Sequence, residues 1–102
     1  MSRRLIVEPG TEADIGNGYD WYQERQIGLG LKFIEEVDVA FNRIVENPVS
    51  YQEVALGIRR AVVHTYPYLV FFTFDSEAVY ILAVLPAAQD PAYINARLEA
   101  ES

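Results

Sequence analysis

The sequence of 102 residues contains no cysteine and only one histidine, His64. A chain without cysteine forms neither a disulfide nor a thiolate metal site, and one histidine cannot make a histidine cluster. We therefore expect no metal site and no cofactor. The absence of cysteine is also typical of a cytoplasmic protein, which has no use for disulfides.

Long hydrophobic runs are absent as well. The longest apolar stretch, residues 78–88, is far shorter than the ~20 residues that cross a bilayer. Near the start, only the three apolar residues 5–7 stand before Glu8 and Pro9, which is too short for the core of a signal peptide. We expect no membrane association and, with an apolar fraction of 51%, a single domain over residues 1–102.

Basic residues are scarce relative to acidic ones. Eight Lys and Arg oppose fifteen Asp and Glu, which gives a net charge of −7 and a pI near 4.5. Such a charge repels phosphate backbones and argues against direct nucleic-acid binding. However, residues 56–74 contain no carboxylate and carry Arg59, Arg60 and His64. A local anion site therefore remains open in this segment.

The N-terminal part predicts a strand followed by a helix. Residues 4–9 have strand character and end at a Pro-Gly pair. We expect the helix to begin at Thr11, whose side chain would cap it together with Asp14 three residues on. Because Gly16 and Gly18 each cost ~1 kcal/mol in a helix relative to alanine, this helix must depend on packing. Its predicted apolar face consists of Ile15, Tyr19 and Tyr22.

A second helix is predicted from Leu31 to the Asn-Pro pair at residues 47–48, which would end it. A Gly-Leu-Gly break at residues 28–30 separates the two helices by few residues, so they would form an antiparallel hairpin. The apolar stripe of the second helix is Leu31, Ile34, Val37, Phe41 and Ile44. The opposite side carries Glu35, Glu36 and Asp38, which we interpret as a solvated face rather than a metal or acid–base site.

Three segments rich in β-branched and aromatic residues follow a loop at residues 48–57, namely 58–64, 68–74 and 78–85. Their short links predict an antiparallel meander. Residues 90–98 would add a terminal helical turn, with Asp90 as its cap and Pro91 at its first position.

The order strand–helix–helix–strand–strand–strand predicts an α+β fold. In such a fold the helical hairpin packs on one face of a mainly antiparallel sheet, because its single apolar side needs a cover. The first strand would be inserted beside the last ones.

The aromatic residues of the central segment could stack nucleic-acid bases or form a core; they are Tyr66, Tyr68, Phe71, Phe72 and Phe74. Alternate residues of a strand face opposite sides, so Phe71 cannot share a face with Tyr68 and Phe72. The helical hairpin would then bury about half of the set. We therefore interpret these aromatics mainly as core residues.

Six motifs follow one another along the chain, namely DWYQER, GLGLKFIEEV, RIVENP, IRRAVVHTYPYLVFF, ILAVL and DP. In this order and spacing they resemble the RelE/ParE superfamily of toxins from bacterial type II toxin–antitoxin systems, often labelled plasmid stabilisation proteins. The resemblance covers nearly the whole chain. It implies the fold given above and a small cytoplasmic toxin that is neutralised by an antitoxin encoded beside it.

The resemblance also bears on enzymatic activity. In the branch of the family that cleaves messenger RNA, basic side chains on the sheet cradle the scissile phosphate. This sequence has Leu69 and Gln89 where basic residues are usual, and Pro86 where a histidine is usual. Arg60 does match a basic residue of that branch, so it is a candidate for phosphate contact. Arg59, His64 and Tyr93 match the pattern less closely and are further candidates for phosphate contact and proton transfer. The missing charges argue against an enzyme.

The helical hairpin is similar to that of the ParE branch, which implies binding to DNA gyrase without chemistry of the toxin's own. Two alternatives stay open: a ribosome-dependent messenger-RNA endonuclease using Arg60 with His64 and Tyr93, and a decayed toxin that retains only antitoxin binding. The antitoxin would fold as it binds in the groove between hairpin and sheet. Its basic surface would complement the acidic toxin, so the complex would weaken with added salt.

Single residues allow both a binding and a structural interpretation. Trp21 lies about 100° from Tyr22 around a helix, so it becomes an exposed anchor if Tyr22 joins the apolar face. Arg59 and Arg60 point to opposite faces, and in the structural interpretation the inward one pairs with a carboxylate of the helices. His64 near a turn is a structural hydrogen-bonding group or a general base. The predicted partner-binding residues are Trp21, Arg59, Arg60, Gln89, Asp90 and Arg97.

Overall fold

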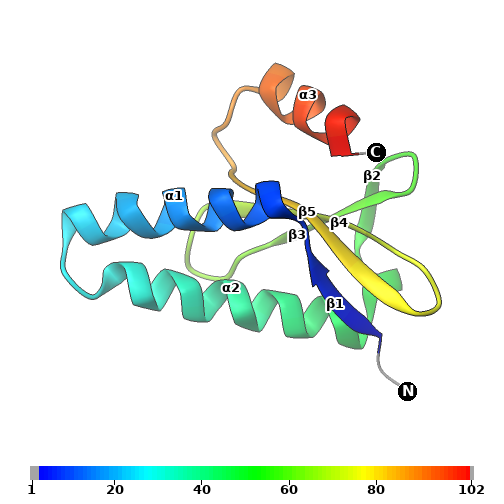
Figure 1. Ribbon diagram of the computed structural model, residues 1–102, viewed down its shortest axis with the longest axis horizontal. Coiled ribbons are helices and arrows are strands. Elements are labelled where there is room, and N and C mark those ends of the chain that lie inside the picture. The colour runs from blue at the N-terminus through cyan, green and yellow to red at the C-terminus, as the bar shows by residue number, and fades with distance from the viewer. Residues whose placement is uncertain (1–2, 102) are drawn as a thin grey trace.

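A computed structural model describes residues 3–101 of the chain (Figure 1). In this range the elements are β1 (Arg4–Val7), α1 (Pro9–Arg25), α2 (Leu29–Glu46), a 3-10 turn (Pro48–Ser50), β2 (Gln52–Ala55), β3 (Ile58–Val62), β4 (Tyr68–Phe74), β5 (Ala78–Pro86) and α3 (Pro91–Glu101). The strands form one sheet in the order β1-β5-β4-β3-β2, in which β1 runs parallel to β5 and the other neighbours are antiparallel. The hairpin of α1 and α2 covers one face of this sheet, which confirms the predicted α+β fold (Figure 1).

The edge strand β2 was not predicted. Residues 52–55, expected in a loop, pair antiparallel with β3, and the register shifts between Glu53 and Ala55. All four residues of β2 are exposed, so no alternation of buried and polar residues marks the strand in the sequence. The prediction of a loop at this place is therefore wrong, because backbone pairing with β3 alone defines the strand.

The start of α1 also differs from the prediction. The helix begins at Pro9, and Thr11 and Asp14 lie inside it, so they do not form a capping box. The hydroxyl of Thr11 instead donates to the carbonyl of Ile81 at 2.8 Å, and Asp14 Oδ2 accepts the N–H of Val84 at 3.1 Å. These contacts exist because β1 pairs with β5 only as far as Ile81. Beyond that point, side chains of α1 satisfy backbone groups on the open edge of β5.

A bulge in β5 changes which face its residues present. Phe71 pairs with Ala83 and Phe72 with Ile81, so Leu82 is the extra residue. The bulge turns Leu82 and Ala83 to the same side and returns Val84 to the side of Ile81. As a result β5 supplies buried residues to both faces of the sheet, which accounts for its nearly continuous apolar sequence.

The larger core lies between the helical hairpin and the sheet. Its buried members are Phe33, Val37, Ala40, Phe41, Ile44, Ala61, Val63, Tyr68, Val70, Phe72, Val79, Ile81 and Val84. Phe71 belongs to a smaller cluster on the other face, as the alternation predicted, and the aromatic residues are mainly core. The prediction that Leu31 joins the buried stripe of α2 is wrong, since Leu31 is 59% exposed and Phe33 is fully buried. The stripe is rotated because Gly30, not Leu31, faces α1.

The two helices of the hairpin approach each other through glycines. A Cβ atom added at Gly18 would lie 2.5 Å from the Phe33 ring, and one added at Gly30 would lie 2.7 Å from the Tyr19 ring. Each helix therefore offers a glycine to an aromatic ring of the other. This packing is the compensation that the glycine-rich first helix was predicted to need. Gly16, by contrast, has no atom within 4 Å of an added Cβ.

The C-terminal helix α3 begins as predicted, with Pro91 at its first position and the Asp90 carboxylate accepting the N–H of Ala92 at 2.9 Å. It is longer than the single turn expected and covers the face of the sheet opposite the hairpin. There Leu98 joins the smaller apolar cluster, with Ile94 packed against it. No helix within residues 3–101 is long and apolar enough to cross a membrane.

Candidate functional site

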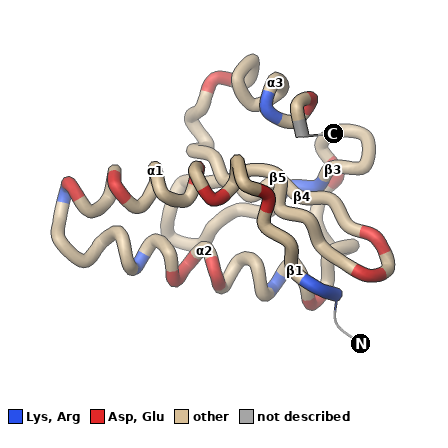
Figure 2. The backbone as a smooth tube through the Cα atoms, viewed as in Figure 1, with Lys and Arg blue, Asp and Glu red and all other residues tan. Residues whose placement is uncertain are grey.

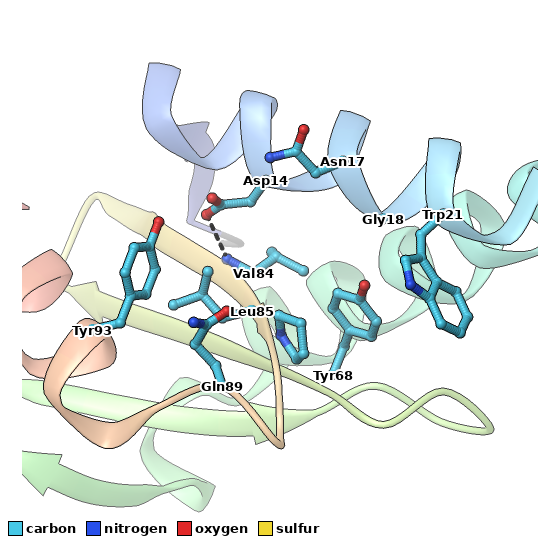
Figure 3. A pocket seen from close by; sticks show the side chains of 10 residues that line it. Asp14, Asn17, Gly18, Trp21, Tyr68, Val84, Leu85, Gln89 and Tyr93 are labelled. Atoms are coloured by element: carbon cyan, nitrogen blue, oxygen red, sulfur yellow. Dashed lines mark hydrogen bonds between the residues drawn. The ribbon is translucent and has the colours of Figure 1, made fainter.

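Two adjoining hollows run between α1, the C-terminal half of β5 and the start of α3. Their volumes are about 210 and 220 Å³, and Trp21, Tyr68 and Pro86 line both. We call their union the α1–β5 groove; it is lined by Asp14, Asn17, Gly18, Trp21, Tyr22, Pro67, Tyr68, Val84, Leu85, Pro86, Ala88, Gln89 and Tyr93. Figure 3 shows Asp14 and Asn17 projecting from α1 on one side, Gln89 and Tyr93 on the other, and Trp21 and Tyr68 toward one end.

The base of the groove is held by a buried charge pair. Asp14 is only 7% exposed, and its two oxygens accept hydrogen bonds from Arg97 Nη1 at 2.7 Å and Nη2 at 2.8 Å. The same carboxylate accepts the N–H of Val84. The hydrogen bonds to Asp14 raise the pKa of Arg97 above its already high value, so the guanidinium stays charged. This fork ties α3 to α1 and to the edge of β5.

The opposite end of the groove is aromatic and apolar. Trp21 is 47% exposed, and the guanidinium of Arg25 lies 3.1 Å from the centre of its ring. Tyr22 meets the indole edge-on at a centroid distance of 4.9 Å. Burial raises the pKa values of Tyr22 and Tyr68, so both phenols stay neutral and present apolar rings. This end therefore suits a large apolar side chain of a partner.

The groove brings together several of the residues that the sequence singled out. Trp21, Gln89 and Tyr93 line it, and Arg97 lies at its base through the contact with Asp14. Asp90 is not among the lining residues and serves as the cap of α3.

The two adjacent arginines lie outside the α1–β5 groove and differ from each other. Arg59 is half-buried and donates to the carbonyl oxygens of Tyr51 at 2.6 Å and Val49 at 3.3 Å. The carboxylate that it approaches is Glu53 of β2 at 4.0 Å, so the structural interpretation, in which the inward arginine pairs with a carboxylate of the helices, is wrong. The contact between Arg59 and Glu53 could not be foreseen, because β2 itself was not predicted. Arg60 is exposed and lines another hollow, beside α3.

The residues proposed for ribonuclease chemistry are not gathered in one place. Arg60 lines the hollow beside α3, Tyr93 lines the α1–β5 groove, and His64 lines a third hollow against α2. Phosphodiester cleavage needs an acid, a base and a cation around one phosphate. Within residues 3–101, the side chains also form no group of three or more acidic residues and histidine that could hold a metal ion.

Asp14 and Asn17 are site residues that sequence reasoning missed. The only available signal was spacing, since Thr11, Asp14 and Gly18 recur at intervals of three and four residues and are the buried positions of α1. A carboxylate on a buried helical stripe requires a partner, which here comes from a residue 83 positions later in the chain.

Charge is unevenly spread around the site. Figure 2 shows acidic residues on both helices of the hairpin and at the turn between β4 and β5, while Lys and Arg are fewer and scattered. Among the described residues, none of those that line the α1–β5 groove is a Lys or Arg, and the two guanidiniums beside it are engaged by Trp21 and Asp14.

Comparisons with known proteins agree on one group. A family model described as the ParE toxin of the type II toxin–antitoxin system, parDE, matches residues 5–91. A solved structure of the chromosomal ParDE toxin–antitoxin system from P. aeruginosa has a similar fold, with a TM-score of 0.74 and 16% sequence identity. The similarity covers 82% of this chain and 95% of the other. No curated protein sequence matches the chain.

Proposed function

Because this chain belongs to the ParE toxin family of type II toxin–antitoxin systems, we propose that it is a toxin held inactive by a protein antitoxin bound in the α1–β5 groove. The observation that carries this proposal is the half-exposed indole of Trp21 at the apolar end of the groove. Tryptophan next to a hollow is the side chain most typical of binding hot spots. The family match supports a protein antitoxin as the partner, and the shape of the groove supports this place for it.

The antitoxin segment would place one apolar side chain between Trp21, Tyr68 and Pro86. Further along, the amides of Asn17 and Gln89 and the hydroxyl of Tyr93 would form hydrogen bonds with its backbone or polar side chains. Such a segment gains affinity from its anchors and loses part of it in becoming ordered. The carboxylate of Asp14 is already satisfied by Arg97 and Val84, so it would shape the groove without binding the partner directly.

The charge of the toxin sets the charge of its partner. At −7, the toxin favours a segment with net positive charge, whose association would be faster at low ionic strength. Affinity for the antitoxin should therefore fall as salt is added. The encounter takes place in the cytoplasm in this proposal.

The toxic action in this proposal is binding to a protein target, DNA gyrase, without cleavage of RNA. Two features support this choice over RNA cleavage. Arg60, His64 and Tyr93 line three different hollows, and that of His64 lies against α2 and shares no residue with the other two, which argues against a joint phosphate site. The net charge also disfavours contact with an RNA backbone.

Calorimetry with the purified product of the adjacent reading frame tests antitoxin binding. Trp21→Ala should weaken binding by about 30-fold or more, because loss of a hot-spot anchor removes about 2 kcal/mol. Leu31→Ala is the matched control, since Leu31 is exposed on α2 and does not line the groove. Equal affinities of the Trp21→Ala variant and the wild type for this product would contradict antitoxin binding in the α1–β5 groove.

The target is tested by expressing the toxin without its antitoxin. Growth arrest with trapped gyrase–DNA complexes is the expected result. Cleavage of messenger RNA in a translation extract would instead support the endonuclease alternative. Harmless expression with intact antitoxin binding would support a toxin that has lost its activity.

A further inference from the structure

A second hollow, on the other side of the sheet from the helical hairpin, has a different chemistry from the α1–β5 groove. It has a volume of about 310 Å³ and lies between the strands and α3. Its walls are mainly apolar, formed by Val54, Ala55, Leu69, Phe71, Ala87, Pro91, Ile94 and Leu98. Its polar side chains are Arg60, Gln89 and Asn95. We call it the Arg60 hollow.

Arg60 is the one ionisable side chain among the described residues that line this hollow. Its backbone is fixed within the sheet, because Arg60 pairs with Gln52 of β2 on one side and Phe71 of β4 on the other. Within the part of the chain that the structure describes, its guanidinium makes neither a hydrogen bond nor an ion pair. In this respect it differs from Arg59 and Arg97, whose guanidinium groups have backbone or carboxylate partners.

The chemistry of the hollow specifies a ligand. A guanidinium binds a carboxylate through two parallel hydrogen bonds, and the amides of Gln89 and Asn95 can donate further ones. The apolar floor of Leu69 and Phe71 suits an aliphatic stem leading to that carboxylate. These features fit the side chain of a glutamate or aspartate in a protein segment. An RNA strand fits poorly, since one cation cannot neutralise a run of phosphates.

The Arg60 hollow adjoins the α1–β5 groove. Gln89, in the linker between β5 and α3, lines both. One extended segment of a partner can therefore reach both places by passing over this linker. Its apolar anchor would lie at Trp21 and its acidic side chain at Arg60.

We propose that the Arg60 hollow binds one acidic side chain of the same antitoxin segment that occupies the α1–β5 groove. This inference rests on the proposed function, because it assumes a protein partner in the groove. A single carboxylate in an otherwise basic segment fixes the register in which the segment lies. It also discriminates against partners that lack the carboxylate, since their binding would leave the guanidinium desolvated and unpaired.

The test is a double-mutant cycle measured by calorimetry with the purified product of the adjacent reading frame. Arg60→Gln should weaken binding about 10-fold or more, and Arg60→Lys should weaken it less, because lysine keeps the charge but not the fork. Replacing each Asp or Glu of the partner in turn by its amide should reveal one position whose effect disappears in the Arg60→Gln background. Arg43→Gln is the matched control and should bind like the wild type. Arg43 is an exposed arginine on α2 that lines neither site.

The outcomes separate this inference from the function on which it rests. If Trp21→Ala weakens binding and Arg60→Gln does not, the Arg60 hollow is not part of the interface although the groove is. If the adjacent product does not bind the wild-type toxin at all, both proposals fail. A fluorescent RNA oligonucleotide that binds the wild type and is released by Arg60→Gln would overturn the assignment to a carboxylate. Thermal unfolding of each variant shows whether a loss of affinity reflects a loss of structure.

Discussion

The two faces of the sheet are covered in different ways. On one face, α1 and α2 enclose a large core in which aromatic rings meet glycines and branched aliphatic residues. On the other face, α3 contributes the buried Leu98 and the partly buried Ile94 to a small cluster. The ion pair between Asp14 and Arg97 holds α3 in place there. The family match ends at residue 91, where α3 begins. The difference indicates that packing fixes the hairpin face, whereas a polar link positions the α3 face beside both candidate binding sites.

Truncating one buried side chain on each face measures this difference most strongly. Phe33→Ala should lower the free energy of unfolding by about 3–5 kcal/mol, because Phe33 is fully buried and contacts rings of both layers. Leu98→Ala should lower it by only about 2 kcal/mol, at the low end for leucine, because α3 is covered on one side alone. Urea denaturation of the two variants gives both values. Equal losses would mean that the two faces are equally tightly packed.

Removing the polar link should loosen α3 selectively. Arg97→Met leaves the Asp14 carboxylate buried without its charged partner and should cost about 2–3 kcal/mol. This is less than for a fully buried pair, because the Arg97 side chain remains 18% exposed. Hydrogen exchange should accelerate in α3 far more than in α2. Uniform acceleration across all helices would contradict the view that α3 is held separately.

Alanine substitutions at two glycines of α1 should change the free energy of unfolding by smaller amounts and in opposite directions. Gly18→Ala should destabilise the protein by about 1–2 kcal/mol, because the added methyl group overlaps the enclosed Phe33 ring. Gly16→Ala should stabilise it by up to about 1 kcal/mol, because the position is open and alanine is the better helix former. Thermal unfolding of both variants checks the signs. Stabilisation by Gly18→Ala would show that the hairpin helices can move apart without loss.

The smallest expected effect is the contribution of Arg60 to the salt dependence of antitoxin affinity. In the complex with the adjacent-frame product, raising salt should weaken the wild type more than the Arg60→Gln variant, if the hollow contributes one ion pair. The expected difference is about threefold in affinity between low and physiological salt, since a pair that the partner covers is screened less than an exposed one. Parallel salt curves for the two proteins would indicate that Arg60 makes no ionic contact.

Local periodicity was sufficient to predict most of the fold. The apolar stripe of α2 and the alternation around Phe71 and Phe72 each follow from residues a few positions apart, so the hairpin and the central strands were correctly predicted. Two features depended on distant partners instead. β2 exists through pairing with β3 although all its residues are exposed, and Leu31 was misplaced because the approach of α1 at Gly30 rotates the helix.

The candidate site was predictable only in part, for the same reason. Trp21 could be identified because its neighbour Tyr22 belongs to the apolar face, which leaves the indole outside. Asp14 could not, because its carboxylate binds Val84 and Arg97, which lie 70 and 83 positions away. The local sequence predicted that Asp14 caps the helix, because aspartate near the start of a helix commonly does so. Its real partners appear only once β5 and α3 are placed against α1.

Trp21 is the single tryptophan of the chain, so its fluorescence reports directly on the α1–β5 groove. The measurement is a fluorescence titration of the toxin with the product of the adjacent reading frame. Any tryptophan in that product is first replaced by phenylalanine, so that Trp21 alone emits. The two readouts are the emission maximum and the quenching by acrylamide. Occupation of the groove predicts a shift of the emission to shorter wavelength and protection of the indole from acrylamide at saturation. Tight binding that leaves both the emission and the quenching of Trp21 unchanged would contradict the account.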